Sequence, residues 1–219
     1  YHGLSFQMLT YLDVVLSNAE RWLGEAVRPA GVLYFHVHRP LLQTDNPIPA
    51  EAAEAERFRR HRMTGLVTAD TKAVHAMDRT LAQGETRSEI IPVALKKDGG
   101  FQAYSSVVTP EQWERLRRYV RAVIRTIGEE IMAGRADIAP YRDGDETPCR
   151  FCEYRAVCQF DPAFGGNAYR RLADGSKDVW WALMERAAAE ADSREERAGR
   201  RSEAEDDREG GADHDDNAK

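Results

Sequence analysis

Apolar residues near the start of the chain recur every three or four positions. Between residues 4 and 26 they are Leu4, Met8, Tyr11, Leu12, Val15, Leu16, Ala19, Trp22 and Leu23. This period predicts an amphipathic helix with a wide apolar stripe. The next apolar run, residues 31–38 (GVLYFHVH), is apolar on both alternating faces and ends before Pro40. Its short length and its valine and aromatic content predict a strand that is buried on both sides.

The pattern then changes several times before residue 109. Two prolines mark residues 41–49 as a loop, and residues 51–62 (EAAEAERFRRHR) predict a short helix with exposed arginines. Those arginines are Arg57, Arg59, Arg60 and Arg62. Residues 70–82 predict another helix, with Asp70 as its N-cap. Two β-rich runs flank Asp98 and Gly99, which predicts a hairpin.

The strongest helix signal of the chain begins at Thr109. Thr109 can cap, Pro110 suits the first helical position, and Gln112 completes a capping box. We expect this helix to run to about Ala133. Its apolar stripe consists of Trp113, Leu116, Val120, Ile124, Ile127 and Ile131. A shorter helix is predicted for residues 177–191.

The end of the chain has a different composition from the rest. Residues 192–219 carry eleven acidic and six basic side chains and almost no large apolar one, which predicts a disordered acidic tail. The tail therefore holds five of the six net negative charges, and the remainder is nearly neutral. The chain therefore lacks the overall basic field that would indicate a nucleic-acid-binding protein. We find no apolar signal-peptide region and no run long enough for a membrane span, so we expect a cytoplasmic protein.

All three cysteines lie within ten residues, as Cys149-x2-Cys152-x5-Cys158. An odd number so closely spaced is a poor disulfide framework and favours a soft-metal site in a reducing compartment. Both zinc and iron–sulfur clusters use the C-x2-C step. Phe151, Tyr154, Val157 and Phe160 interleave the cysteines, and we expect these side chains to shield a cluster from solvent. Three free cysteines, or a zinc site completed by His36 or His38, remain as alternatives.

Gln7 and Tyr11 lie four residues apart and so share one face of the first predicted helix. Spacing alone favours a boundary role for them at the edge of the core, although amide and phenol groups also suit contacts with phosphates or base edges. His36 and His38 share one face of the predicted strand, where packed histidines are favoured over metal ligands.

The Gln-x3-Tyr helix and the C-x2-C-x5-C loop together resemble the RecB-family nucleases with an iron–sulfur staple. Longer stretches resemble, within that family, the AddB-type B subunits of bacterial ATP-dependent helicase–nucleases. These stretches are YHGLSFQMLTYLD, AGVLYFHVHRP, MTGLVTAD, SEIIPVALKKDGGFQAYSSVVT and CRFCEYRAVCQFD. The similarity extends over roughly residues 1–172.

The resemblance implies that Cys149, Cys152 and Cys158 hold a 4Fe–4S cluster whose fourth cysteine lies far upstream. It also implies that the Asp and Asp-x-Lys residues, which hold catalytic Mg²⁺ in such nucleases, precede Tyr1. Asp13, Asp45 and Asp70 lack the expected strand context and are not assigned. Gln7 and Tyr11 are then the nuclease-motif residues present, with the role of positioning DNA. We expect this chain alone neither to cleave nor to unwind DNA.

The sequence thus predicts an α/β fold, a truncated PD-(D/E)XK-type (restriction-endonuclease-like) core with a helical iron–sulfur-bearing end. The predicted parts are a nuclease region (1–172, with the cluster loop at 148–160), a helix (173–191) and the tail (192–219). The resemblance implies a subunit that uses ATP, pairs with an AddA-like helicase–nuclease subunit and processes DNA double-strand ends for recombinational repair. The alternatives are a non-catalytic cluster-binding module and a zinc-binding interaction domain unrelated to DNA.

Overall fold

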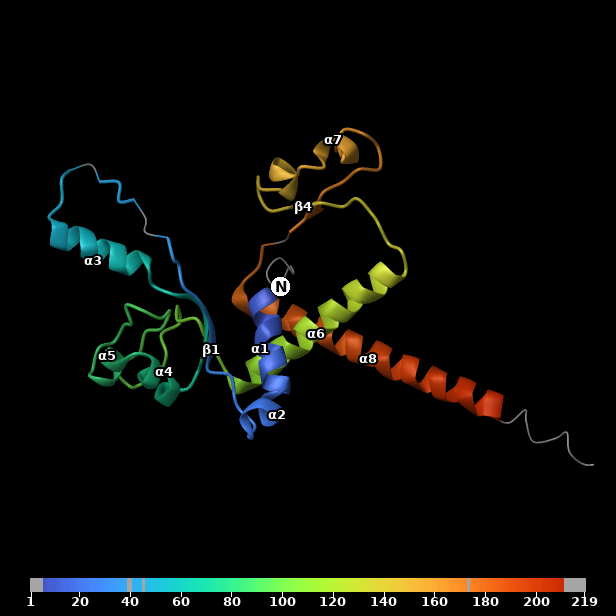
Figure 1. Ribbon diagram of the computed structural model, residues 1–219, viewed down its shortest axis with the longest axis horizontal. Coiled ribbons are helices and arrows are strands. Elements are labelled where there is room, and N and C mark those ends of the chain that lie inside the picture. The colour runs from blue at the N-terminus through green and yellow to red at the C-terminus, as the bar shows by residue number, and fades with distance from the viewer. Residues whose placement is uncertain (1–5, 39–40, 45, 173, 211–219) are drawn as a thin grey trace, which may run out of the picture. The chain divides into compact units, whose positions relative to one another are not determined.

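The computed structural model describes residues 6–38, 41–44, 46–172 and 174–210 of the chain. They form a mixed α/β structure with small sheets and several helices (Figure 1). The chain divides into two compact units, Ser5–Arg117 and the residues from Arg118 onward. The first, here called the sheet unit, contains a three-stranded sheet, and the second, here called the helical unit, contains the three cysteines.

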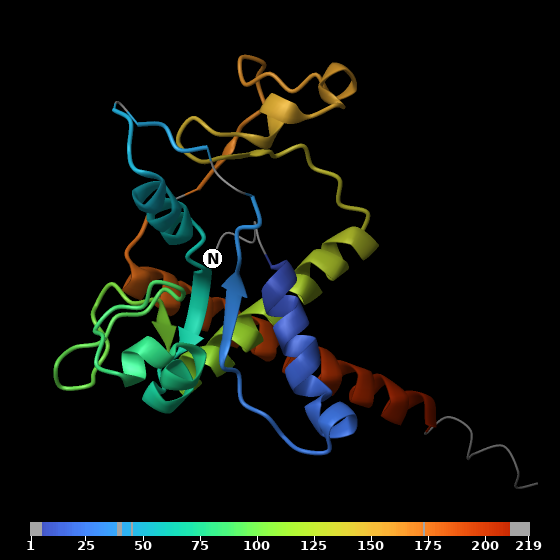
Figure 2. The ribbon, with the colours of Figure 1, turned by 60° about the vertical axis from the view of Figure 1, so that its left-hand side comes forward.

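The strands of the sheet unit are ordered β1-β2-β3 (Figure 2). Their bounds are Gly31–Tyr34, Thr64–Thr68 and Val107–Val108. Strand β2 pairs antiparallel with β1, where Tyr34 faces Thr64, and parallel with β3, where Val67 faces Val107. The central strand β2 was not predicted, because Gly65 interrupts a short run that resembles a loop in sequence.

The core of the sheet unit lies where β2, the helices that follow it and the turn region 85–106 meet. Its buried members are Val67, Val74, Leu81, Ile91, Val93 and Leu95. Each of them is at most 7% exposed, and three are fully buried. The burial of these β-branched and aliphatic side chains supplies most of the stability of such a small unit.

The predicted strand over residues 31–38 is shorter and more exposed than expected. Pairing stops at Tyr34 because its partner strand begins at Thr64. Val32 is buried, whereas Tyr34, Phe35 and Val37 are 45, 60 and 85% exposed. The expectation of burial on both sides is therefore wrong for this segment, since β1 is an edge strand of a three-stranded sheet.

The helices described in the sheet unit before α6 are short. They are α1 (Gln7–Ser17), α2 (Ala19–Leu23), α3 (Ala50–Arg60), α4 (Thr71–Met77) and α5 (Arg79–Ala82). Two predicted helices are each divided in two. The first breaks at Asn18, whose side-chain amide donates to the Val14 carbonyl oxygen at 2.8 Å. The second breaks at Asp78, which caps α5. Asn and Asp side chains compete with the helix for backbone groups in this way.

Helix α6 (Pro110–Met132) confirms the predicted capping box and the predicted extent. The backbone N–H of Gln112 donates to Thr109 Oγ1 at 3.2 Å, and the backbone N–H of Thr109 donates to Gln112 Oε1 at 2.9 Å. Of the predicted apolar stripe, Trp113, Leu116 and Val120 are buried. The remaining three residues of the stripe, Ile124, Ile127 and Ile131, are exposed.

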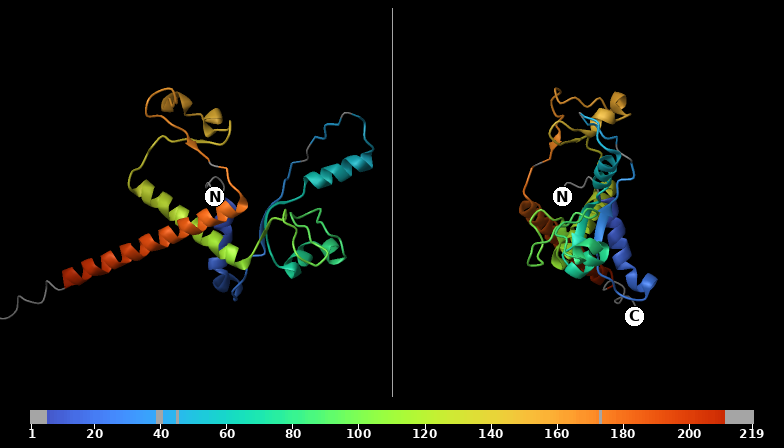
Figure 3. Two further views of the ribbon diagram at one scale, coloured as in Figure 1. Left: turned by 180° about the vertical axis from the view of Figure 1, so that it is seen from behind. Right: turned by 90° about the vertical axis from the view of Figure 1, so that its left-hand side faces the viewer.

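In the helical unit, α8 (Lys177–Gly210) is one continuous helix (Figure 3). Its buried residues include Trp181, Met184 and Ala188, and Arg118 of α6 donates to Glu185 of α8 at 3.0 Å. The tail predicted to be disordered from Asp192 is thus helical up to Gly210, and its last part, 211–219, lies outside the described residues. Glu and Arg are good helix formers, and pairs such as Arg200 with Glu196, at 3.3 Å, support an exposed helix.

The cysteine-bearing region lies between α6 and α8. Its elements are β4 (Tyr141–Arg142), the 3₁₀ helix η1 (Pro148–Phe151), α7 (Arg155–Cys158) and β5 (Arg170–Arg171). Within the described ranges, no helix is long and apolar enough to cross a membrane.

Candidate functional site

Gln7 and Tyr11 lie on one face of α1, as their spacing predicts, and both are exposed. Gln7 Nε2 donates to the Tyr11 hydroxyl at 3.0 Å, and Tyr11 is 55% exposed. The bond holds the two side chains together. It leaves the side-chain oxygen of Gln7, Oε1, and the Tyr11 O–H for other partners. The expectation that these residues only mark the edge of the core does not fit this exposure. The pair forms a polar surface that can both donate and accept hydrogen bonds.

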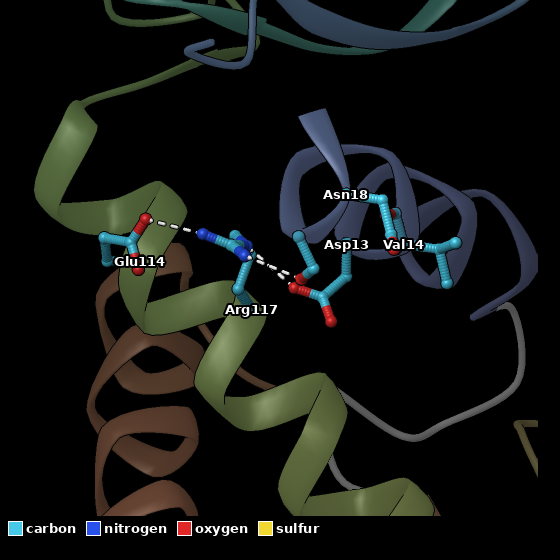
Figure 4. Close-up of polar contacts among 6 residues, drawn as sticks. Asp13, Val14, Asn18, Glu114 and Arg117 are labelled. Carbon is cyan, nitrogen blue, oxygen red and sulfur yellow. Dashed lines mark hydrogen bonds and ion pairs between the residues drawn. The ribbon is translucent and has the colours of Figure 1, made fainter. Parts of the chain in front are cut away.

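Helix α1 is fixed by a partly buried ion pair within the sheet unit (Figure 4). Arg117 of α6 donates from Nε to Asp13 at 2.8 Å, and its side chain also reaches Ser17 and Glu114. Asp13 and Arg117 side chains are only 14% and 18% exposed. Pairing at this depth fixes the rotation of α1, and therefore the direction in which Gln7 and Tyr11 point.

Two of the three aspartates considered as metal ligands make other contacts in the structure. Asp13 binds Arg117 as described. Asp70 caps α4 by accepting from the Lys72 amide nitrogen at 2.8 Å. Asp45 lies outside the described residues. The described contacts of Asp13 and Asp70 are thus an ion pair between helices and a helix cap.

The cysteine loop is closed at its base by a short parallel pair. Tyr141 faces Arg170 and Arg142 faces Arg171. Phe160 packs edge to face against Tyr169, the residue next to this strand pair in sequence, with 4.9 Å between ring centroids. The Arg142 guanidinium carbon lies 5.6 Å from the Tyr169 ring centroid. These contacts make residues 143–169 a loop with fixed ends.

The thiols of the loop are placed by two short helical turns. Thr147 caps η1, accepting from the Cys149 amide nitrogen at 3.4 Å, and Cys158 ends α7. All three cysteines are free, Cys149 half-buried and Cys152 and Cys158 exposed. Three thiolates are the donor type that zinc and iron–sulfur clusters take. However, no group of three or more His, Cys, Asp or Glu side chains among the described residues is arranged to hold a metal. The donor chemistry fits a cluster, whereas the described arrangement does not gather the thiols.

The expected apolar shield around the cysteines is wrong for three of its four members. Phe151, Tyr154 and Val157 are 84, 73 and 84% exposed. Phe160 alone of the four is turned toward the loop, against Tyr169. A short loop has too little surface of its own to cover four large side chains.

His36 and His38 are exposed rather than packed, with ring centroids 6.4 Å apart. The backbone oxygen of His36 lies 2.8 Å from His61 Nδ1. The expectation of buried, hydrogen-bonded histidine side chains in a central strand is therefore wrong, because pairing of β1 ends at Tyr34.

Asp78 is a buried carboxylate that the sequence pattern alone did not single out. Burial raises its pKa, but hydrogen bonds from Ser88 and then Thr80 outweigh burial and hold the pKa below the usual 3.8. The Ser88 hydroxyl donates at 2.6 Å and in turn accepts from the Ile90 and Ile91 amide nitrogens. The Asp-x-Thr order was a visible capping signal. The carboxylate is enclosed by this network and serves the fold.

Comparison with known proteins identifies the class. The sequence model of the PD-(D/E)XK nuclease superfamily matches residues 1–159. The chain belongs to this superfamily. Several bacterial relatives named as the B subunit of an ATP-dependent helicase/deoxyribonuclease are similar to it. That of Bacillus licheniformis is 45% identical over 190 residues, or 87% of this chain, and that of Bacillus pumilus is 41% identical over 192 residues, or 88%. That of Oceanobacillus iheyensis is 39% identical over 186 residues, or 85% of this chain.

The chain spans only 16% of the length of these relatives. The expected resemblance to helicase–nuclease B subunits and the expected PD-(D/E)XK fold class are both confirmed by these matches. The activity, substrate and partner of a whole subunit belong to a much longer protein than this chain.

Proposed function

We propose that this chain is part of the nuclease domain of an ATP-dependent helicase–deoxyribonuclease B subunit. The subunit would process DNA double-strand ends for recombinational repair in the cytoplasm, paired with an AddA-like subunit. The observation that carries the proposal is the superfamily match over residues 1–159, together with relatives at 39–45% identity that bear this name. ATP would drive unwinding in the helicase part.

In this proposal Gln7 and Tyr11 position the DNA strand. Their hydrogen-bonded pair is exposed, so a phosphate oxygen can accept from the Tyr11 hydroxyl, and a base-edge N–H can donate to the side-chain oxygen of Gln7. A divalent ion such as Mg²⁺ supplies an attacking water of lowered pKa and neutralises charge on the phosphate. No residue of this chain is assigned as its ligand.

We further propose that Cys149, Cys152 and Cys158 supply three thiolates to a 4Fe–4S cluster whose fourth ligand is another cysteine of the whole subunit. Their spacing and the closed base of the loop support this assignment. Replacing Cys152 with Ser in the full-length subunit should lower the iron and sulfide content, and DNA-end binding should weaken with it. Stoichiometric zinc, or unchanged iron in Cys152→Ser, would overturn the cluster assignment.

The test of the function uses the full-length subunit together with its co-purified partner. Linear duplex DNA should be degraded only with both ATP and Mg²⁺. Gln7→Ala should reduce nuclease activity by about 2 kcal/mol of transition-state stabilisation, or some thirtyfold, and leave ATP hydrolysis intact.

Gln83→Ala is the matched control, because Gln83 is an exposed glutamine at the end of α5 in the same unit. It should leave both activities unchanged. A wild-type complex that hydrolyses ATP on DNA ends but never degrades them would contradict the nuclease assignment.

A further inference from the structure

A hollow lies where the end of β1 meets the residues that follow α3. Its volume is about 440 Å³, within the range of small-ligand sites. The residues that line it are Tyr34, Phe35, His36, Arg60, Arg62 and Thr64. We call this surface the arginine–aromatic hollow. All of its residues belong to the sheet unit, and none takes part in the Gln7–Tyr11 pair or the cysteine loop.

The aromatic side of the hollow is exposed, and one of its two rings is held by a local contact. Tyr34 and Phe35 are 45% and 60% exposed. Phe35 stacks on His61 at 5.8 Å between ring centroids and 21° between planes, and His61 Nδ1 is held by the His36 carbonyl oxygen. Two large rings open to water, one of them held by stacking on a neighbouring ring, are typical of a binding surface rather than of a core.

The other side of the hollow is positively charged. Arg62 Nε donates to the Ile91 carbonyl oxygen at 3.1 Å, which fixes the guanidinium without neutralising it. Arg60 lies 3.4 Å from Glu56, an exposed pair that contributes little. The described residues lining the hollow include no carboxylate. An anionic ligand is therefore favoured on this side.

A second hollow next to it has a different charge. It has a volume of about 770 Å³, and two glutamates, Glu54 and Glu89, line it together with Arg57, Arg59 and Phe58. Arg57 and Arg59 are paired with Glu54 and Glu56 at 2.6 and 3.1 Å. Because its charges are balanced, it does not favour an anion.

We propose that the arginine–aromatic hollow binds one nucleotide of single-stranded DNA. The base would stack on the exposed rings of Tyr34 and Phe35, and a phosphate would contact Arg60 and Arg62. An aromatic platform beside arginines is the arrangement that binds unpaired strands, because only an unstacked base offers its face to a side chain. The inference rests on the proposed function, and it adds a strand contact separate from Gln7 and Tyr11.

The first test is photo-crosslinking of the full-length complex to oligo(dT) that carries 5-iodouracil, with the crosslinked peptides mapped by mass spectrometry. Crosslinks at Tyr34 or Phe35 support the proposal. Crosslinks found only elsewhere would overturn it and leave the proposed function standing. A complex that neither crosslinks to DNA nor degrades it would overturn both the proposal for the hollow and the proposed function.

The second test measures affinity for oligo(dT) by fluorescence anisotropy over a range of salt concentrations. Phe35→Leu keeps an apolar side chain without the ring and should weaken binding about fivefold or more. Arg60→Gln should flatten the slope of log K against log salt by about 0.7, the value of one phosphate contact on a single strand. A purely structural residue would not change this slope.

Matched controls lie in the same unit. Tyr104→Leu removes a ring that is 69% exposed and does not line the hollow, and Arg79→Gln removes an exposed arginine of α5. Both should bind as the wild type does. If Phe35→Leu and Arg60→Gln instead release the partner subunit while binding oligo(dT) normally, the hollow is a protein interface and the proposal is wrong.

Discussion

The sheet unit and the cysteine loop use their large apolar side chains in opposite ways. In the sheet unit, Val67, Val74 and Val93 are fully buried between β2, α4 and the turn region. In the cysteine loop, Phe151 and Val157 are each 84% exposed. The first region is stabilised by burial, whereas the second is fixed at its base by β4, β5 and one aromatic pair.

This difference separates the residues that make the fold from those that offer chemistry. The candidate DNA contacts, Gln7 and Tyr11, stand on a helix that the Asp13–Arg117 ion pair fixes against α6. The thiols instead stand on a loop with little packing of its own. Loops of this kind take their final order from a ligand more than from a core. Substitutions should therefore have large effects in the sheet unit and small ones in the loop.

Gly65→Ala should have the largest effect. Gly65 has φ of 136° in β2, and a Cβ there would collide with the Val32 carbonyl oxygen and lie 3.1 Å from Leu33 Cα. Strain and collision together should destabilise the sheet unit by about 3 kcal/mol. The Thr68 amide, which donates to the Ala30 carbonyl oxygen next to β1 at 2.8 Å, reports the loss by hydrogen exchange.

The matched control is Gly128→Ala, since nothing lies within 4 Å of a Cβ at Gly128 in α6. Alanine favours a helix over glycine by about 1 kcal/mol, so α6 should exchange more slowly while β2 stays unchanged. Unchanged exchange at Thr68 in Gly65→Ala would mean that β2 is not held against β1 as described.

Ser88→Ala should come second. It removes the 2.6 Å hydrogen bond to Asp78 and the acceptor for two amide nitrogens. Leaving these buried groups unsatisfied should reduce the free energy of unfolding of the sheet unit by about 2 kcal/mol. Ser106→Ala is the control, because no described residue accepts from or donates to the Ser106 hydroxyl.

The effect of Ser88→Ala on the free energy of unfolding should depend on pH through Asp78. The pKa of Asp78 is lowered in the folded chain, so its stabilisation is complete above the unfolded value of 3.8 and is lost as pH falls through the folded value. Ser88→Ala raises the folded pKa of Asp78. The stability difference between wild type and variant should then be constant at neutral pH and shrink below about pH 3.8. A difference that grows on acidification would contradict the assignment.

Local signals in the sequence predicted the elements that local interactions fix. The capping box of Thr109 and Gln112 predicted the start of α6, and Asp70 predicted the start of α4. The unpredicted strand β2 depends instead on partners from distant parts of the chain, β1 and β3, which no local pattern encodes. The exposure of Phe35 was missed for the same reason, because a strand end without a partner looks like any other apolar run.

The candidate sites follow the same division. The spacing of Gln7 and Tyr11 was enough to place both on one face, since four residues make about one helical turn. The spacing of the cysteines identified the donors but not their surroundings. Whether Phe151, Tyr154 and Val157 cover the thiols depends on the tertiary position of a loop, which alternation in sequence does not determine.

The smallest expected effects lie in the cysteine loop and compare two of its aromatic residues. Phe160→Ala removes the edge-to-face contact with Tyr169 and should loosen the base of the loop by about 1 kcal/mol. Phe151→Ala removes an exposed ring and should change stability by less than about 0.5 kcal/mol. Hydrogen exchange of the Arg170 and Leu172 amides, which donate to Pro140 and Arg142 at 2.9 Å, measures both.

The order of these two effects distinguishes a loop held at its base from a loop wrapped round a cluster. A larger effect of Phe160→Ala means that the aromatic pair with Tyr169 fixes the loop. A larger effect of Phe151→Ala in metal-loaded protein, which disappears after chelation, means that the exposed rings close over bound metal. In that case the contrast between a buried sheet unit and an open loop holds for the metal-free chain only, and the ligand supplies the core that the loop lacks.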